Sequence, residues 1–440
     1  MAKLFDLSLK LNGFPIGKAK QRLQQITAVS AADYAEFLDT KKREIATYHL
    51  QHNSFYRNLV GNHDFKSWEQ LPIMMKRDLQ RPLNDRLSDG FSAKSVYINK
   101  TSGSSGDPFV FAKDKFCHAL IWANIMRRFA MYGIDFNHSY QARFYGMPLH
   151  FPAKQILRVK DFLSNRYRFS IFDLSDSGIQ KIIAEFKTRP FTYINGYTSP
   201  IVLIAKYLSK KGLILKNICP TLRVCIVTSE MLLDEDRKLL RDQFGIPVVN
   251  EYGASELDVI AFENPDGKWM VNAETTFVEI VDETGMPLPY GEEGRIVVTS
   301  LYNKAHPMIR YDVGDTGILD TESTAKYPIL QKLSGRTNDF ALLPSGKKPA
   351  GMTFYSITKA LFGDEGNVKE FVIWQTKLDT FEIRYTSENP LNEDEITNME
   401  RVLATYLEDG LTFRFIRQEK LERTSSGKLK QFVSLIEKQK

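Results

Sequence analysis

The sequence has 440 residues, of which 43% are hydrophobic. Because single hydrophobic cores stop growing near roughly 250–300 residues, more than one domain is expected. The 59 Lys and Arg residues exceed the 53 Asp and Glu residues only slightly, without a long basic run, which argues against a nucleic-acid-binding protein.

Cysteine usage and hydropathy also exclude classes of protein. Cys117, Cys219 and Cys225 form no C-x-x-C pair, so neither a disulfide framework nor a cysteine zinc site is expected. No stretch approaches the ~20 consecutive apolar residues of a membrane span, and the N-terminal residues lack the apolar segment of a signal peptide. We therefore expect a cytoplasmic protein.

The first part of the chain is predicted to be helical. From about residue 16 to 60, apolar residues recur every three or four positions, which is typical of amphipathic helices. Another helix is expected in "DKFCHALIWANIMRRFAMYG", closed by Gly133. Farther along, apolar runs such as "FTYINGY" and "LRVCIVTSE" alternate with helical patterns, which predicts βαβ units around a parallel sheet.

The last third of the chain changes in texture. From about 275 to 333, short strands separated by Gly and Pro turns predict a β-rich subdomain. The segments after "SGRTNDF" predict a small α+β unit. We therefore expect an α/β protein with a large N-terminal domain, residues 1–335, and a small α+β C-terminal domain, residues 336–440.

The stretch "TSGSSGDP", Thr101 to Pro108, is the first candidate for a binding loop. Glycines let main-chain N–H groups approach a ligand closely, and the loop follows a β-like run and precedes a helix, where a phosphate would bind at a sheet edge. A flexible linker has the same composition. The loop lacks the G-K-[ST] ending of a P-loop, which excludes that class.

Three further motifs each allow two interpretations. In "NEYGASELD", Tyr252 could cover an adenine and Glu256 could hold Mg²⁺, or a strand could turn into a helix capped near Ser255. In "MIRYDVGDTG", Asp315 could accept the two hydroxyls of a ribose, or it could begin a type I turn. In "ERTSSGKLKQF", Lys428 lies in a polar loop, where taken alone it is simply a solvated lysine.

The order of these motifs favours the functional interpretations. "TSGSSGDP", "YGASE", "IRYDVGD", "GRTNDF" and "RTSSGKLKQ" resemble, in this order, the motifs of the adenylate-forming superfamily, the acyl-CoA synthetases and their relatives. The resemblance runs from about residue 70 to the end. In "DETGMPLPYGEEGRIVVTSL" and "PMIRYDVGD" it is strongest to phenylacetate-CoA ligases and to ligase-like proteins of capsule-polysaccharide gene clusters.

The resemblance implies a function. It implies activation of a small carboxylic acid, which could be aromatic, by ATP and Mg²⁺ to an acyl-adenylate, followed by transfer to coenzyme A. The acceptor could instead be a carrier-protein thiol, an amine or a sugar hydroxyl. An inactive nucleotide-binding scaffold is the alternative from another class. The sequence indicates no particular acid or oligomeric state.

The resemblance also assigns roles to individual residues. The phosphate-binding loop would comprise Thr101, Ser102, Gly103, Ser104, Ser105 and Gly106. The rest of the ATP site would comprise Ser229, Glu230, Tyr252, Gly253, Asp315 and Arg336, with Glu256 as the Mg²⁺ ligand. The acyl pocket would be lined by Phe144, Tyr145, Gly196, Tyr197 and Ala254.

The catalytic lysine would come from the other domain. By the same resemblance, Lys428 would stabilise the charge that develops as the acid attacks the α-phosphate, with Glu256 as the second catalytic residue. The C-terminal domain would be mobile and would rotate between the two half-reactions about a hinge at Asn338 and Asp339. Asn338 departs from the acidic residue that is frequent at this position.

Overall fold

The computed structural model describes residues 4–61, 65–100, 109–145, 155, 158, 160–171, 174–229, 232, 234–335, 341–347, 349, 354, 357–358, 361, 367–387, 389–419, 421 and 432–436. Within these ranges, no helix is both long and apolar enough to cross a membrane.

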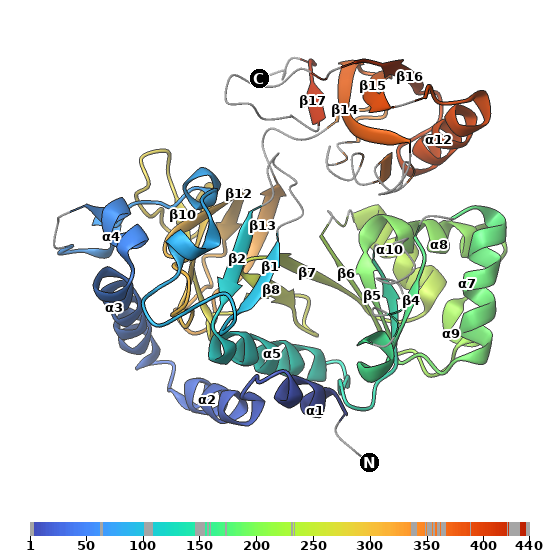
Figure 1. The fold of residues 1–440 in the computed structure, drawn as a ribbon. Helices are drawn as coiled ribbons and strands as arrows, with labels where there is room; N and C mark the ends of the chain where they lie inside the picture. Colours follow the sequence, from blue (N-terminus) through green and yellow to red (C-terminus); the bar gives the residue numbers. More distant parts are fainter. Residues whose placement is uncertain are drawn as a thin grey trace.

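The chain opens with the predicted helical layer. The helices are α1 (Leu4–Leu11), α2 (Ile16–Ala28), α3 (Tyr34–His52) and α4 (Ser54–Val60), followed by the 3₁₀ helices η1 (Trp68–Gln70), η2 (Lys76–Leu79) and η3 (Leu83–Arg86). Helix α5 (Lys115–Ala130) begins at Asp114, whose carboxylate accepts a hydrogen bond from the Cys117 N–H at 2.8 Å. Helices α1 and α2 lie against α5 at one side of the molecule (Figure 1).

A seven-stranded sheet forms the centre of the larger part of the molecule. Its strands, in spatial order, are β4 (Arg166–Phe169), β3 (Gln141–Phe144), β5 (Tyr193–Tyr197), β6 (Val224–Thr228), β7 (Val248–Ala254), β8 (Asp258–Glu263) and β9 (Trp269–Val271). The strands from β4 to β7 are parallel, and β8 and β9 extend the sheet antiparallel. The predicted parallel sheet is therefore confirmed.

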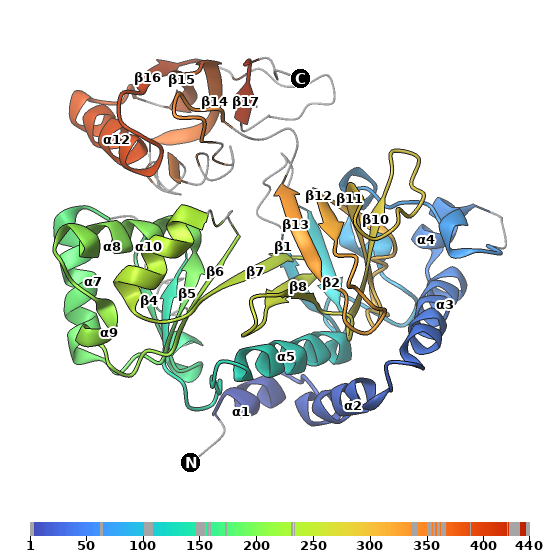
Figure 2. The same cartoon turned by 180° about the vertical axis from the view of Figure 1, so that it is seen from behind.

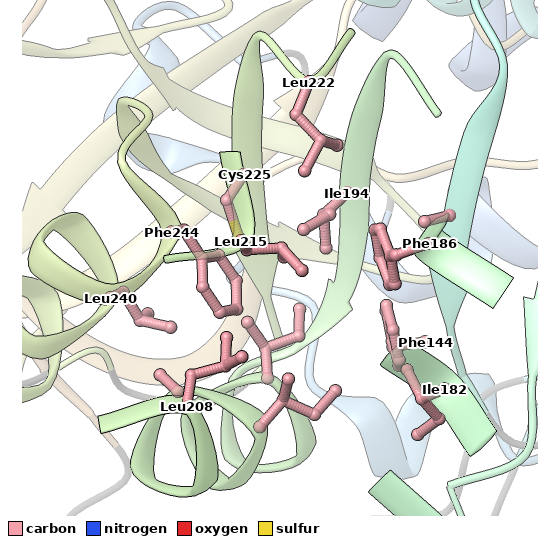
Figure 3. Close-up of a cluster of buried hydrophobic side chains, with 14 of the residues drawn as sticks. Phe144, Ile182, Phe186, Ile194, Leu208, Leu215, Leu222, Cys225, Leu240 and Phe244 are labelled. Atoms are coloured by element: carbon pink, nitrogen blue, oxygen red, sulfur yellow. The ribbon is translucent and has the colours of Figure 1, made fainter. Parts of the chain in front are cut away.

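Helices cover the two faces of this sheet unequally. One face packs on α7 (Asp176–Thr188), α8 (Thr198–Lys210), α9 (Leu215–Ile218) and α10 (Asp234–Phe244) (Figures 1 and 2). Figure 3 shows the core between them, in which Phe144, Ile194 and Cys225 of the strands meet Phe186, Leu208 and Phe244 of the helices. On the opposite face, α5 covers only part of the strands, through Phe129 packed against Tyr193.

A second sheet confirms the predicted β-rich segment. It is an antiparallel meander of β10 (Thr276–Val281), β11 (Glu293–Ser300), β12 (Tyr311–Leu319) and β13 (Leu330–Gly335). Strands β1 (Tyr97–Lys100) and β2 (Val110–Lys113) pair with each other as an antiparallel hairpin. The glycine-rich stretch thus connects the two strands of a hairpin. The expectation that it connects a strand of the parallel sheet to a helix is wrong.

The C-terminal elements form their own sheet and core. Strands β14 (Val368–Lys377), β15 (Thr380–Ser387), β16 (Thr412–Arg417) and β17 (Phe432–Ser434) are arranged in the order β16-β15-β14-β17, and α12 (Glu393–Tyr406) packs on them. This group, orange to red in Figure 1, lies apart from the two larger sheets. The mixed α/β architecture agrees with the predicted fold class, while the division at residues 335 and 336 stays a prediction.

Candidate nucleotide and acyl site

Three segments far apart in the sequence meet between the seven-stranded sheet and the β10–β13 sheet: the start of β2, strand β7 with the turn that follows it, and strand β12. Phe109, Tyr252 and Tyr311, one from each region, belong to a single hydrophobic core. The ring centroids of Phe109 and Tyr311 are 6.5 Å apart. The segments that carry three of the sequence motifs are therefore neighbours in space.

Asp315 is held by the tyrosine of another motif. The Tyr252 hydroxyl, at the end of β7, donates a hydrogen bond of 2.8 Å to Oδ2 of Asp315. Asp315 lies inside β12, paired with β11, so the alternative that it begins a type I turn is wrong. Because Tyr252 is only 8% exposed, this bond fixes the orientation of the carboxylate.

Glu256 is oriented in the same way by a second tyrosine. The Tyr311 hydroxyl donates a hydrogen bond of 2.8 Å to Oε1 of Glu256. Glu256 lies in the turn that joins β7 to the antiparallel strand β8, so the alternative of a helix capped near Ser255 is also wrong. The buried Lys113 of β2 forms an ion pair with Asp258 at the end of this turn, which ties the β1–β2 hairpin to it.

The residues around Glu256 fit a magnesium ion that is shared with a nucleotide. Among the described residues, no group of three His, Cys, Asp or Glu side chains could hold a metal by itself. Mg²⁺ often binds through one or two carboxylates together with substrate phosphates, so a single oriented carboxylate is an adequate protein ligand.

Gly253 is required by the pairing of β7 with β8. A Cβ atom at this position would lie 2.2 Å from the carbonyl oxygen of Asp258. The glycine therefore lets the two strands approach at the point where Tyr252 and Glu256 leave the sheet. Ala254, the last residue of β7, is half-buried beside it.

Ser229 has the backbone conformation that non-glycine residues usually avoid. It directly follows β6, at the carboxyl end of a central parallel strand, with φ of 71°. Such a conformation costs on the order of 1 kcal/mol or more, and strained residues cluster at binding sites. The position is also the edge at which open parallel sheets bind ligands.

The predicted acyl-pocket residues separate onto two faces. Tyr145 and Tyr197 lie together, with ring centroids 4.8 Å apart, and both are partly accessible. Phe144 instead points into the helix-covered core (Figure 3), 1% exposed and stacked on Phe169 at 4.7 Å. We therefore remove Phe144 from the pocket, because successive side chains of a strand face opposite sides.

Gly196 has a packing role next to Phe144. A Cβ atom there would lie 2.3 Å from the Phe144 carbonyl oxygen on the adjacent strand. Its lack of a side chain is thus explained by the contact of β3 with β5, without a substrate.

Comparison with known proteins gives relatives along most of the chain. No protein-family model matches. Protein CapK of Staphylococcus aureus is 23% identical over 420 residues, 90% of this chain and 88% of that protein. A phenylacetate-coenzyme A ligase of Thermus thermophilus is 22% identical over 352 residues, 69% of this chain and 71% of that protein.

A solved structure has the same fold. A 2-hydroxyisobutyryl-CoA ligase, in the postadenylation state with 2-HIB-AMP, has a TM-score of 0.58 at 16% identity and covers 92% of this chain and 90% of its own. The chain is thus similar along most of its length to protein CapK and to the phenylacetate-coenzyme A ligase, and it has the fold of an adenylate-forming ligase.

Several superfamily motif residues lie outside the described residues. These are the loop residues Thr101, Ser102, Gly103, Ser104, Ser105 and Gly106, together with Glu230, Arg336, Asn338, Asp339 and Lys428. Their roles remain predictions from the resemblance.

Sequence reasoning missed four residues that surround the superfamily motifs. Tyr311 lies within the segment "IRYDVGD", and Lys113 follows the glycine-rich stretch without a motif of its own. Arg143 and Glu251 lie on the accessible face of the parallel sheet, and burial raises the pKa of the Glu251 carboxyl to about 7. The signal for Arg143 and Glu251 was a charged residue within otherwise buried strands.

Proposed function

We propose that this protein uses ATP to convert a carboxylic acid into an acyl-adenylate and then transfers the acyl group to coenzyme A. The observation that carries the proposal is the pair of tyrosine-oriented carboxylates. Asp315 and Glu256 come from different sheets, and each accepts a tyrosine hydrogen bond of 2.8 Å. Two carboxylates whose orientation is fixed in this way suit a ligand that carries both ribose hydroxyls and a metal-bound phosphate chain.

The described residues have distinct roles in this proposal. The Asp315 carboxylate accepts hydrogen bonds from the ribose, and the ring of Tyr252 contacts the adenine. Glu256 is the protein ligand of Mg²⁺, which when bound would neutralise the phosphates and ease departure of pyrophosphate. Ser229 lies at the sheet edge where the acid and the α-phosphate would meet. Lys428 would add a positive charge to the developing phosphorane.

A second acyl acceptor is supported by the relatives. The likeness to protein CapK extends over 90% of this chain, farther than the 69% of the phenylacetate-coenzyme A ligase. Our second candidate is therefore the same adenylation followed by transfer to an amine, a hydroxyl or a carrier-protein thiol in surface-polysaccharide synthesis.

Pyrophosphate release tests the first half-reaction. The protein is incubated with ATP, Mg²⁺ and a panel of acids, with and without coenzyme A, and the acyl product is identified by mass. Acid-dependent pyrophosphate release that Glu256→Gln abolishes supports adenylation, and Glu292→Gln, an exposed glutamate, is the matched control. Formation of an acyl-CoA supports the first acceptor, while an adenylate that coenzyme A does not consume favours the second. ATP binding without release with any acid would favour the scaffold.

A further inference from the structure

A polar cluster lies on the accessible face of the parallel sheet, opposite the helix-covered core. Alternation along the strands places its members on this face: Arg143, Tyr145, Asn195, Tyr197, Thr228 and Glu251. Toward the amino ends of the strands, the same face becomes apolar and packs on α5. The Arg143 cluster thus begins where the cover of α5 ends, at the carboxyl edge of the sheet.

The Arg143 guanidinium has no polar partner among the described residues. Its Nε atom is buried without a hydrogen bond. The guanidinium carbon lies 3.9 Å from the centre of the Tyr145 ring, whose hydroxyl is already bonded to Asn195 at 3.1 Å. Stacking orients the guanidinium but leaves the buried Nε–H unsatisfied, and unsatisfied buried donors are rare because they are costly.

Among the described residues, no carboxylate forms an ion pair with Arg143, although Glu251 lies close enough for the two charges to interact. Arg166 and Arg168 lie on the adjacent strand, and both pair with the single buried carboxylate of Asp161, at 3.6 and 2.9 Å. Glu251 is the other acidic group of this face, and burial raises its pKa to about 7, so near neutral pH it is only partly ionised. The Arg143 charge lowers the pKa of Glu251, but burial has the larger effect and raises it.

We propose that Arg143 binds an anionic group at the far end of the acid, so that the enzyme prefers dicarboxylic acids to aromatic or aliphatic monocarboxylic acids. The inference rests on the proposed function, because it assumes that the acid is activated near Ser229 at the sheet edge. Arg143 is level with Asn195 of β5 and Ile226 of β6, and Ile226 lies three residues before Ser229, roughly 10 Å along the strand. This short separation fits an acid with few carbons between its carboxylates.

The test compares acids of equal carbon number. Pyrophosphate release is measured with succinate against butyrate, glutarate against pentanoate, adipate against hexanoate, and with phenylacetate. For the preferred dicarboxylate we expect kcat/KM at least about tenfold above that of its monocarboxylate. Arg143→Gln should lower the dicarboxylate value by roughly thirtyfold or more and leave the monocarboxylate value within about twofold. Arg223→Gln, at an arginine that donates to the Gly133 carbonyl, is the matched control.

Thermal denaturation separates binding from folding. Since the described structure gives Arg143 no hydrogen bond to lose, Arg143→Met should melt at or above the temperature of the parent protein. A markedly lower melting temperature would assign the guanidinium to the fold and overturn the inference.

The two proposals fail in different ways. Equal use of dicarboxylates by the parent protein and by Arg143→Gln would overturn the role of Arg143 while adenylation stands. If pyrophosphate is released with none of the acids, the adenylation proposal is wrong, and the melting temperature with dicarboxylate alone then tests the anion site. An increase in the parent but not in Arg143→Gln supports the anion site, and no increase in the parent excludes it.

Discussion

At the scale of single residues, the Tyr252–Asp315 bond offers the most direct test of the nucleotide site. Asp315→Ala should weaken ATP binding by on the order of 3 kcal/mol, roughly a hundredfold, because two charge-assisted hydrogen bonds to the ribose are lost. Tyr252→Phe removes only the bond that orients the carboxylate and should weaken ATP binding by about fivefold. Calorimetric titration with ATP measures both. Tyr327→Phe, at a tyrosine that is 51% exposed, is the control, and unchanged affinity in Asp315→Ala would exclude ribose binding by this residue.

A second prediction at this scale concerns pH and Glu251. Burial raises the carboxyl pKa to about 7 in the folded protein from the ordinary value of 4.5 in the unfolded chain. The folded state therefore binds the proton more tightly between these values, so the contribution of Glu251 to stability falls as pH rises from about 4.5 to 7. Glu251→Gln should be more stable than the parent at pH 8, by at most about 3 kcal/mol, and nearly equal to it near pH 5.

Urea denaturation at both pH values measures this difference. The control is Glu283→Gln, at an exposed glutamate, and its difference in stability from the parent should be the same at both pH values. If the difference in stability between Glu251→Gln and the parent were the same at both pH values, the pKa of the folded Glu251 carboxyl would not be raised.

At the scale of elements, the pairing of β7 with β8 positions both carboxylates, and Gly253 permits it. Gly253→Ala would bring a Cβ atom to 2.2 Å from the Asp258 carbonyl oxygen, so we expect a loss of roughly 3 kcal/mol in the free energy of unfolding and weaker ATP binding. Gly17→Ala, in α2 with no heavy atom within 4 Å of the added carbon, should instead stabilise by roughly 0.5–1 kcal/mol. Thermal denaturation compares them, and similar effects of the two substitutions would contradict the close approach.

The elements also show which inferences a sequence permits. The apolar runs predicted β5 and β6 because these strands are buried along almost their whole length, and the helical patterns predicted α8 and α10. The hairpins were not predicted. Antiparallel partners such as β1–β2 and β7–β8 are chosen by contacts across the strands, and "NEYGASELD" has the composition of either a strand–turn–strand or a strand–turn–helix.

The same limit applied to the candidate site. Motif order identified Tyr252, Glu256 and Asp315, but their partners depend on which strands lie side by side. The face occupied by Phe144 followed from strand alternation only once the neighbouring helices were known. That the Nε atom of Arg143 lacks a hydrogen bond could not be predicted from the sequence, because it depends on which strands lie beside β3.

At the scale of the whole molecule, the proposed reaction requires two separate parts of the chain. The oriented carboxylates Asp315 and Glu256 belong to the two larger sheets, while the elements after residue 341 have a hydrophobic core that includes no residue of those sheets. Lys428 falls, in sequence, between β16 and β17 of this smaller group. A lysine on a separate unit can act in one half-reaction and be absent from the other, provided that the unit moves.

Lys428→Ala tests this division. Removal of one preorganised positive charge should lower the rate of pyrophosphate release from acid and ATP by roughly a hundred- to a thousandfold. The same variant should convert a supplied acyl-adenylate to product at nearly the parent rate, because the second step no longer needs charge at the α-phosphate. Rapid-quench measurement of each half-reaction gives the two rates, and Lys377→Ala, at a lysine of β14 in the same unit, controls for a general effect on this unit. Equal loss in both half-reactions would mean that Lys428 supports binding or folding, and that the C-terminal unit has no need to rotate between the steps.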